Sequence, residues 1–292
     1  MRIRRVLVVV KETALARLAL DRRPGPRHLR DLIAKSDPSV ANIRPAHDEH
    51  EASVALVLSA LRERRISFRT RSKIPTLPIR GVDLVVTVGG DGMVLGVSHT
   101  VRDGTPILGV NSAPSFSVGY LTGCLGNTFG ATLDALRQGQ VPLAVQRLRV
   151  QIGRRVLAEP VLNDALFCAD NPAVMTRYRL EFPGGEELQR SSGIWVSTPA
   201  GSTSALTSAG GPLLPLTSRQ FAFIAREPYA PPGSAVRYKS AVLMTGDHLT
   251  LECRIMDASV FLDGSHRRYP VALAERVMFS LHDAPLFLVR TA

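Results

Sequence analysis

Runs of apolar residues alternate with amphipathic segments through the first half of the chain. A short, nearly continuous apolar run is typical of a strand buried on both faces, whereas apolar residues at helical spacing indicate a helix with one buried side. This rhythm of strand and helix predicts a parallel α/β sheet. We expect strands over Arg4–Val10, Leu84–Val88 and Pro106–Val110, and helices over His47–Arg65, Met93–Val101 and Asn127–Gln138.

The second half of the chain has short alternating runs from Arg147 onward. Turn signals such as Pro183-Gly184-Gly185 and Asp263-Gly264 separate these runs. The pattern predicts an all-β domain of the sandwich type, with a domain boundary near residue 142. We expect strands over Leu148–Ile152, Val156–Cys168, Tyr178–Phe182, Ile194–Ser197, Phe221–Ala225, Leu249–Ile255 and Val277–Leu281.

Three local features have simple structural interpretations. Residues 21–45 contain several prolines, which favours an irregular loop. Trp195 lies in an apolar strand and is expected in the core. His47-Asp48-Glu49-His50 has the composition of a metal site, but its spacing suits one helix face only loosely, so we expect a solvated helix start.

Composition and charge narrow the class of protein. The 292 residues are 45% hydrophobic and 21% charged, as in a globular protein, and no apolar stretch is long enough to span a bilayer. Three scattered cysteines without metal spacing predict reduced thiols and a cytoplasmic location. The net charge of +11 comes without a dense basic block, which argues against a nucleic-acid partner. It fits either an arginine-rich proteome or a field that attracts polyanionic substrates.

The sequence Gly89-Gly90-Asp91-Gly92 follows the apolar strand at residues 84–88. Glycines at a strand-to-helix turn let the backbone approach a phosphate, and the helix start offers unpaired N–H groups. Because a carboxylate repels phosphate, Asp91 fits better as a general base beside a hydroxyl, or on a metal that bridges phosphates. The alternative is a helix cap. The sequence matches neither the Rossmann fingerprint nor the P-loop.

Two further segments carry candidate chemistry. Asn163-Asp164 interrupts an apolar strand, so the pair either faces a site or caps a turn. Ser197–Ser204 and Ser208–Pro212 combine small hydroxyls with glycines after a β-rich run. Such a loop can bind phosphate or ribose hydroxyls, although the composition alone also suits a linker.

In this order the three segments resemble the signature of the NAD kinases, over about residues 84 to 264. Gly109-Val110-Asn111, Val118–Leu121 and Leu262-Asp263-Gly264 also resemble motifs of that family. The resemblance implies an N-terminal Rossmann-like α/β domain over residues 1–141 and a dinucleotide-binding β-sandwich over 142–270. A C-terminal segment, 271–292, would return to the first domain. The active site would lie between the domains, in a homodimer or homotetramer.

The resemblance also implies the reaction. Asp91 would take the proton from the 2′-hydroxyl of the adenosine ribose of NAD, or also NADH, to give NADP(H). The donor would be ATP, or polyphosphate, with Mg²⁺ carried by the ATP phosphates and no metal ligand from the protein. Substrate or nucleotide binding would fall to Gly90, Gly92, Asn111, Asn163, Asp164, Ser192, Thr198, Gly201, Ser202, Thr203, Ser204, Ser208 and Asp263.

The chain departs from the family pattern at four positions in or beside this set of residues. Asp164 stands where the family usually has Glu, Ser192 where it has Asp, and Ser204-Ala205 where it has Ala-Tyr. These changes leave the choice between NAD and NADH open. Two other functions remain alternatives: a lipid kinase related to diacylglycerol kinase, which shares the Gly-Gly-Asp-Gly loop, and a non-catalytic dinucleotide-binding protein. The serine-rich block favours NAD.

Overall fold

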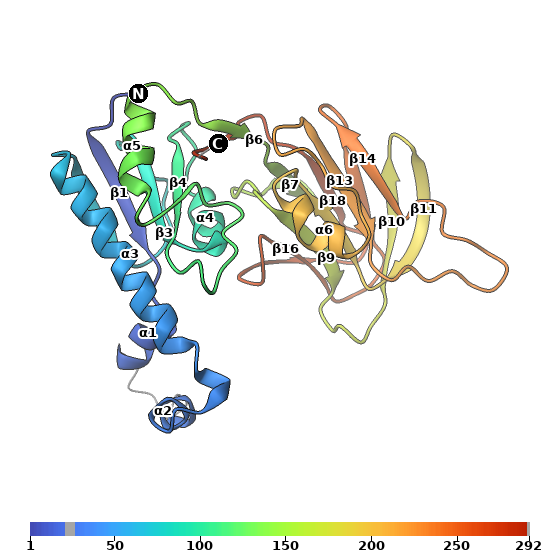
Figure 1. Ribbon diagram of the computed structural model, residues 1–292. Coiled ribbons are helices and arrows are strands. Elements are labelled where there is room, and N and C mark those ends of the chain that lie inside the picture. The colour runs from blue at the N-terminus through green and yellow to red at the C-terminus, as the bar shows by residue number, and fades with distance from the viewer. Residues whose placement is uncertain (21–26, 291–292) are drawn as a thin grey trace. The chain divides into compact units, whose positions relative to one another are not determined.

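The computed structural model describes residues 1–20 and 27–290, which divide into two compact units (Figure 1). Unit 1 comprises Met1–Leu143 and Phe287–Ala292, and unit 2 comprises Ala144–Leu286. The expected fold class, an α/β domain followed by a β-sandwich, is confirmed. The returning segment begins at Phe287 and not at residue 271, because residues 276–281 form a strand inside the sandwich.

A seven-stranded sheet forms the centre of unit 1. Its order is β2-β1-β3-β4-β19-β6, and β5 pairs with β4. Strand β1 runs parallel to β2 and β3. Strand β4 runs parallel to β3, β5 and β19. Its strands are β1 (Arg5–Val10), β2 (Ser67–Arg71), β3 (Leu84–Gly89), β4 (Ile107–Asn111), β5 (Cys124–Leu125), β6 (Leu143–Val145) and β19 (Leu286–Leu288).

Helices cover both faces of this sheet. Leu108 and Val110 of β4 point into a core shared with α3 and α5. Gly109 points to the opposite face, since successive residues of a strand alternate, and a Cβ there would lie 2.8 Å from Val94 Cγ2 of α4. The helices are α1 (Ala14–Leu20), α2 (Arg27–Ala34), α3 (Ile43–Glu63), α4 (Asp91–Ser98) and α5 (Phe129–Arg137). No helix among residues 1–20 and 27–290 is long and apolar enough to cross a membrane.

The expected irregular loop at residues 21–45 is wrong over its second part, while residues 21–26 lie outside the described residues. Helix α2, a 3-10 helix at Pro38–Val40 and the start of α3 occupy residues 27–45. Proline is tolerated at the starts of these helices, because the first turn of a helix needs no backbone N–H partner. Pro38 follows Asp37, whose side chain caps the turn by accepting from Ser39 N, and Pro45 lies in the first turn of α3.

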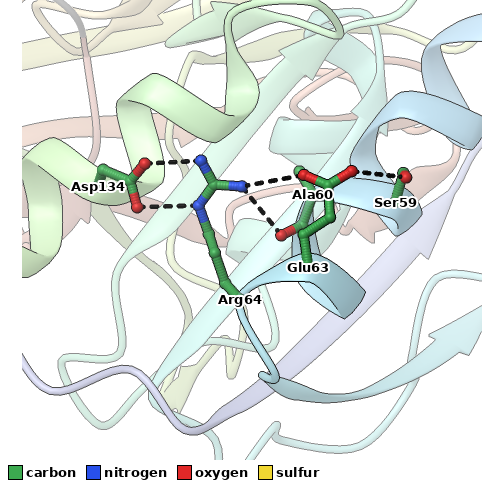
Figure 2. A network of polar contacts seen from close by, with 5 residues as sticks. All are labelled: Ser59, Ala60, Glu63, Arg64 and Asp134. Atoms are coloured by element: carbon green, nitrogen blue, oxygen red, sulfur yellow. Dashed lines mark hydrogen bonds and ion pairs between the residues drawn. The ribbon is translucent and has the colours of Figure 1, made fainter.

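Arg64 joins the end of α3 to α5 (Figure 2). Its guanidinium donates from Nε and Nη2 to the two carboxylate oxygens of Asp134, at 2.8 and 2.6 Å, and from Nη1 to Ala60 O at 3.1 Å. The hydrogen bond from Arg64 lowers the pKa of Asp134. A two-pronged contact of this kind fixes the relative position of the two helices more firmly than a single ion pair.

We expect Asp134→Asn to destabilise the protein by about 1 kcal/mol at pH 7, because the charged, bidentate contact is lost. Since the folded pKa of Asp134 is lowered, its contribution is present above the unfolded pKa and is lost as the pH falls through the folded value. Urea unfolding at pH 7 and pH 3 measures both effects. Glu186→Gln, which breaks the exposed single contact of 3.3 Å to Arg179, is the control. Equal losses in the two variants would contradict the prediction.

Two six-stranded antiparallel sheets share one hydrophobic core in unit 2. Their orders are β11-β10-β15-β18-β7-β8 and β14-β13-β12-β9-β16-β17. The strands are β7 (Leu148–Ile152), β8 (Arg155–Val156), β9 (Asp164–Ala169), β10 (Thr176–Phe182), β11 (Gly185–Ser191), β12 (Ile194–Ser197), β13 (Gln220–Ala225), β14 (Ser240–Met244), β15 (Leu249–Cys253), β16 (Ala258–Leu262), β17 (Arg267–Val271) and β18 (Arg276–Leu281).

The single strand expected over Val156–Cys168 is wrong. It divides into β8 and β9, which belong to different sheets. The chain crosses between the sheets at residues 157–163, where Pro160 cannot donate to a ladder. This crossing places the polar pair Asn163-Asp164 at the start of β9.

Candidate functional site

The Gly-Gly-Asp-Gly sequence forms the turn between β3 and α4 in unit 1. Its first two glycines are closely packed: a Cβ at Gly89 would lie 2.5 Å from Met93 Cγ, and one at Gly90 would lie 2.7 Å from Ser117 Oγ, which would have to move. Gly92 is exposed and has no atom within 4 Å of an added Cβ. The start of α4 is therefore open on the side of Gly92, where backbone N–H groups can meet an anion.

The Asp91 carboxylate holds the loop that follows β4. Its Oδ2 accepts from Tyr120 N at 2.9 Å, and its Oδ1 accepts from Leu121 N at 2.7 Å. The alternative in which Asp91 caps the helix is wrong, because Asp91 is the first helical residue and Gly90 is the N-cap. A carboxylate has about four lone-pair sites, so two remain for a substrate hydroxyl.

A cavity of about 690 Å³ lies beside this turn, entirely within unit 1. Lys11 follows β1, Gly90 follows β3 and Asn111 ends β4, so the cavity sits at the carboxyl edge of the parallel sheet, where such folds bind ligands. Asn111 Nδ2 donates to Ser117 O at 2.8 Å and so shapes the wall formed by residues 112–118. The cavity therefore presents one lysine, two asparagine amides and several hydroxyls.

His50 and His47 also line this cavity, and the expected solvated helix start is wrong for His50. His50 is only 2% exposed, and its Nδ1 lies 2.8 Å from Ser112 Oγ. Burial lowers the pKa of His50, so its imidazole is neutral at pH 7. His47 Nδ1 lies 2.8 Å from Thr13 Oγ1. Both histidines position hydroxyl groups at the cavity.

In unit 2, Asp263 fixes the turn before β9. Its carboxylate accepts from the backbone N–H groups of Leu162, Asn163 and Asp164, at 2.9, 2.7 and 3.1 Å. Burial raises the pKa of Asp263 to about 7, and the Asp164 carboxylate acts in the same direction, whereas the backbone donors oppose the rise. With these contacts, Asp263 positions the Asn163-Asp164 pair.

Asp164 is buried, with 6% of its surface exposed. Its Oδ2 accepts from Asn163 Nδ2 at 2.9 Å and from Ser204 Oγ at 3.2 Å, and Asn163 Nδ2 also donates to Ser204 Oγ at 3.1 Å. Burial raises the pKa of Asp164 to about 6, while the hydrogen bonds from Ser204 and Asn163 lower it. The three side chains form one compact polar cluster.

The serine-rich block contains both structural and surface residues. Thr198 Oγ1 donates to Leu162 O at 2.6 Å, and a Cβ at Gly201 would lie 2.0 Å from Asn163 O, so both hold the block against the polar pair. Ser202 is buried, and its Oγ donates to Pro199 O at 2.8 Å. Thr203 is exposed, and Ser208 lines a separate cavity.

Trp195 was expected in the core, and this expectation is wrong. The residue is partly exposed and lines two cavities of unit 2. One, of about 580 Å³, also contains Ser192, and the other, of about 480 Å³, also contains Ala205. Arg226 lines both cavities, and its guanidinium carbon lies 5.8 Å from the centre of the Trp195 ring. Ser192 is therefore apart from the polar cluster of Asp164.

The sequence-predicted site residues thus fall into separate groups. Gly90, Asp91, Gly92 and Asn111 lie together in unit 1, and Asn163, Asp164, Ser204 and Asp263 lie together in unit 2. No cluster of three or more His, Cys, Asp or Glu side chains suited to a metal occurs within the described ranges, 1–20 and 27–290.

Comparison with known proteins identifies the family. A family model described as the ATP-NAD kinase N-terminal domain matches residues 28–141. A protein named "Probable NADH kinase" from Oryza sativa subsp. japonica is 31% identical over 263 residues, covering 82% of this chain and 81% of its own length. The chain belongs to the NAD kinase family. It is therefore an enzyme, as the resemblance in its sequence implies.

Other members of the NAD kinase family agree with this assignment. An NADH kinase from Arabidopsis thaliana is 32% identical, over 73% of this chain and 74% of its own length. Two solved structures have the same fold. An NAD kinase from Archaeoglobus fulgidus in complex with ATP has a TM-score of 0.66 and 22% identity, covering 97% of this chain and 92% of its own. A yeast NADH kinase complexed with NADH has a TM-score of 0.74 and 14% identity, covering 100% of this chain and 84% of its own.

Proposed function

We propose that this enzyme transfers the γ-phosphate of ATP to the 2′-hydroxyl of the adenosine ribose of NAD or NADH. The observation that carries the proposal is the position of Asp91. Its carboxylate is fixed by two backbone N–H groups at the mouth of an open helix start, next to a cavity with a lysine and several hydroxyls. A fixed base beside an anion-binding turn suits phosphoryl transfer to an alcohol.

The proposed reaction needs little covalent chemistry from the protein. Asp91 accepts the proton of the ribose 2′-hydroxyl while the oxygen of that hydroxyl forms a bond to the γ-phosphorus. The bond from the γ-phosphorus to the bridging oxygen of ATP breaks, and ADP leaves. Gly90 and Gly92 let the donor phosphates approach the backbone at the start of α4. Lys11 and Asn111 supply a positive charge and an amide to the cavity beside that turn.

Magnesium fits this donor set as an ion carried by the nucleotide. Mg²⁺ prefers oxygen ligands and keeps several waters, and it usually binds through substrate phosphates plus one or two carboxylates. Asp91 and the hydroxyls of the cavity offer oxygens, and the described residues form no closed protein cage. When bound, the ion would neutralise phosphate charge.

For the acceptor, we propose that the polar cluster of unit 2 binds a ribose. Asn163 and Asp164 present an amide and a carboxylate, and Asp263, Thr198 and Gly201 hold them in place. The names of the rice and Arabidopsis relatives support NADH as an acceptor, and the ATP complex of the Archaeoglobus kinase supports ATP as the donor. The homodimer or homotetramer stays a prediction.

We expect the purified protein to form NADP from NAD, and NADPH from NADH, when ATP and Mg²⁺ are present. A dehydrogenase specific for the 2′-phosphorylated dinucleotide measures the product. Omitting ATP is the control, and inorganic polyphosphate replaces it in a parallel reaction. Phosphorylation of diacylglycerol without any NADP(H) would contradict the proposal, and so would dinucleotide binding without turnover.

A further inference from the structure

Trp195 forms a wall shared by two cavities of unit 2. It lies in the middle of β12, paired with Leu166 of β9 and Ile224 of β13. Its neighbours in the strand, Ile194 and Val196, point into the sandwich core, so the indole points to the outer face of the sheet. Trp195 packs against a hydrophobic cluster that includes Leu206 and Ile224, and it remains partly exposed.

The surroundings of Trp195 are rigidly held. Ser192 N donates to Arg226 O at 2.9 Å, and Arg226 N donates to Gly193 O at 2.8 Å, so backbone pairing fixes the position from which the guanidinium reaches the indole. The next residue, Glu227, has a φ of +38°, a conformation that non-glycine residues rarely adopt. Backbone strain of this kind persists where the surrounding structure enforces it, and it clusters at ligand sites.

Residue 205, which lines the smaller cavity, is alanine. Ala205 and Trp195 line the same cavity of about 480 Å³, which exceeds the volume of one heteroaromatic ring several-fold. The family pattern has a tyrosine at residue 205, whose ring would project into this space. Here the aromatic surface is instead supplied from the sheet, by Trp195.

The charged side chains that line the smaller cavity favour an uncharged ligand ring over a cationic one. Arg226 and Lys239 are positive and Glu227 is negative, so the wall carries one net positive charge. A cationic ring would be repelled by the guanidinium beside the indole, whereas an uncharged ring can stack on either group. The chemistry therefore fits adenine or reduced nicotinamide better than oxidised nicotinamide.

We propose that Trp195 and Arg226 form a stacking platform for an uncharged heteroaromatic ring of the dinucleotide, in a cavity that Ala205 keeps open. The proposal rests on the proposed function for the identity of the ligand. Stacking of a base on an aromatic side chain changes affinity by about 5- to 150-fold. The platform thus makes Trp195 a specificity-determining residue that replaces the missing tyrosine.

The chain contains a single tryptophan, which makes the platform directly observable. Incorporation of 5-fluorotryptophan gives one ¹⁹F resonance, that of Trp195. We expect this resonance to shift during titration with AMP, with reduced nicotinamide mononucleotide, or with both. The ligand that shifts it identifies the ring that stacks. If neither mononucleotide shifts the resonance at concentrations that inhibit or support the kinase reaction, the platform is wrong.

Two variants test the roles of Ala205 and Arg226. Ala205→Tyr fills the cavity and is expected to abolish the shift on titration. Arg226→Gln is expected to weaken binding of the shifting ligand by about 5- to 10-fold. The matched control is Arg155→Gln, because Arg155 lies 5.9 Å from the ring centre of Tyr269 in the same unit but lines neither cavity. Equal weakening by Arg155→Gln would overturn the role of Arg226.

Formation of NADP(H) is measured on the same protein samples. Turnover with no response of Trp195 would overturn the platform and leave the kinase function intact. A response of Trp195 without turnover would support the platform and overturn the proposed phosphoryl transfer. The two measurements therefore test the stacking platform and the kinase function independently.

Discussion

Replacing Asp91 with asparagine is expected to lower kcat by about 10²–10⁴-fold, the usual contribution of a general base. The carboxamide keeps the size of the side chain but cannot accept the proton of the acceptor hydroxyl. We expect the KM for the dinucleotide to change little, because the cavities and polar clusters remain. Initial rates of NADP(H) formation across pH measure the effect, and wild-type turnover would show that Asp91 only holds the loop.

Loss of the base must be separated from loosening of the loop, because Asp91 also accepts from Tyr120 N and Leu121 N. Gly119→Ala supplies the comparison. Gly119 has a φ of +68°, and an added Cβ would lie 2.5 Å from Asn111 Nδ2, so this change disturbs the same loop while leaving the carboxylate. Asp91→Asn is expected to lose far more kcat than Gly119→Ala. Equal losses would assign the effect to the loop.

The sequence predicted the structure well at positions where the local environment admits few residue types. The apolar run at residues 84–88 is buried in the middle of the parallel sheet, and Gly89 and Gly90 after it pack closely against neighbouring side chains. Such positions are readable because burial on both faces and close backbone approach admit few residue types. The fold class followed from these local patterns.

The burial of His50 is consistent with the helical spacing of the buried residues of α3, but the sequence analysis did not predict it. The buried face of α3 runs through His50, Ser53, Val57 and Leu61, at helical spacing. Polar side chains at two of these positions hid the periodicity, because their hydrogen bonds to Ser112 allow them to be buried. The predicted start of this helix, His47, is later than its actual start, Ile43, because Pro45 within residues 43–46 favoured a loop although it lies in the first turn.

The spatial neighbours of Trp195 and Asp91 could not be predicted from the sequence. Trp195 lines a cavity together with Ala205, a residue that is close to it only in space. The partners of Asp91 are backbone N–H groups of residues 120 and 121, and a backbone group has no identity in the sequence. Tertiary contacts of these kinds cannot be inferred from the local pattern.

Asp164 and Ser204 are hydrogen-bonded to each other, and both depart from the family pattern. The family pattern pairs glutamate with alanine at these positions, whereas this chain pairs the shorter aspartate with serine. Ser204 Oγ donates to Asp164 Oδ2 at 3.2 Å, so the hydroxyl occupies space beside the carboxylate and bonds it. We infer that the two departures compensate each other.

We expect Asp164→Glu alone to lower kcat/KM by about 10²-fold, because an extra methylene at a site only 6% exposed displaces the carboxylate by roughly 1 Å. Ser204→Ala alone removes one hydrogen bond to a buried carboxylate and is expected to cost about tenfold. The double variant restores the family's pair and is expected to recover most of the activity, with a coupling energy of about 1–2 kcal/mol.

The pH dependence of the same variants separates geometry from charge. Burial raises the pKa of Asp164 to about 6, and the Ser204 hydrogen bond opposes this rise. Ser204→Ala should therefore move the inflection of kcat/KM assigned to Asp164 to higher pH, so that less of the enzyme is ionised at pH 6–7. Above this inflection the loss in Ser204→Ala should shrink, whereas the loss in Asp164→Glu should persist. Strictly additive losses in the double variant, at every pH, would show that the two residues do not compensate each other.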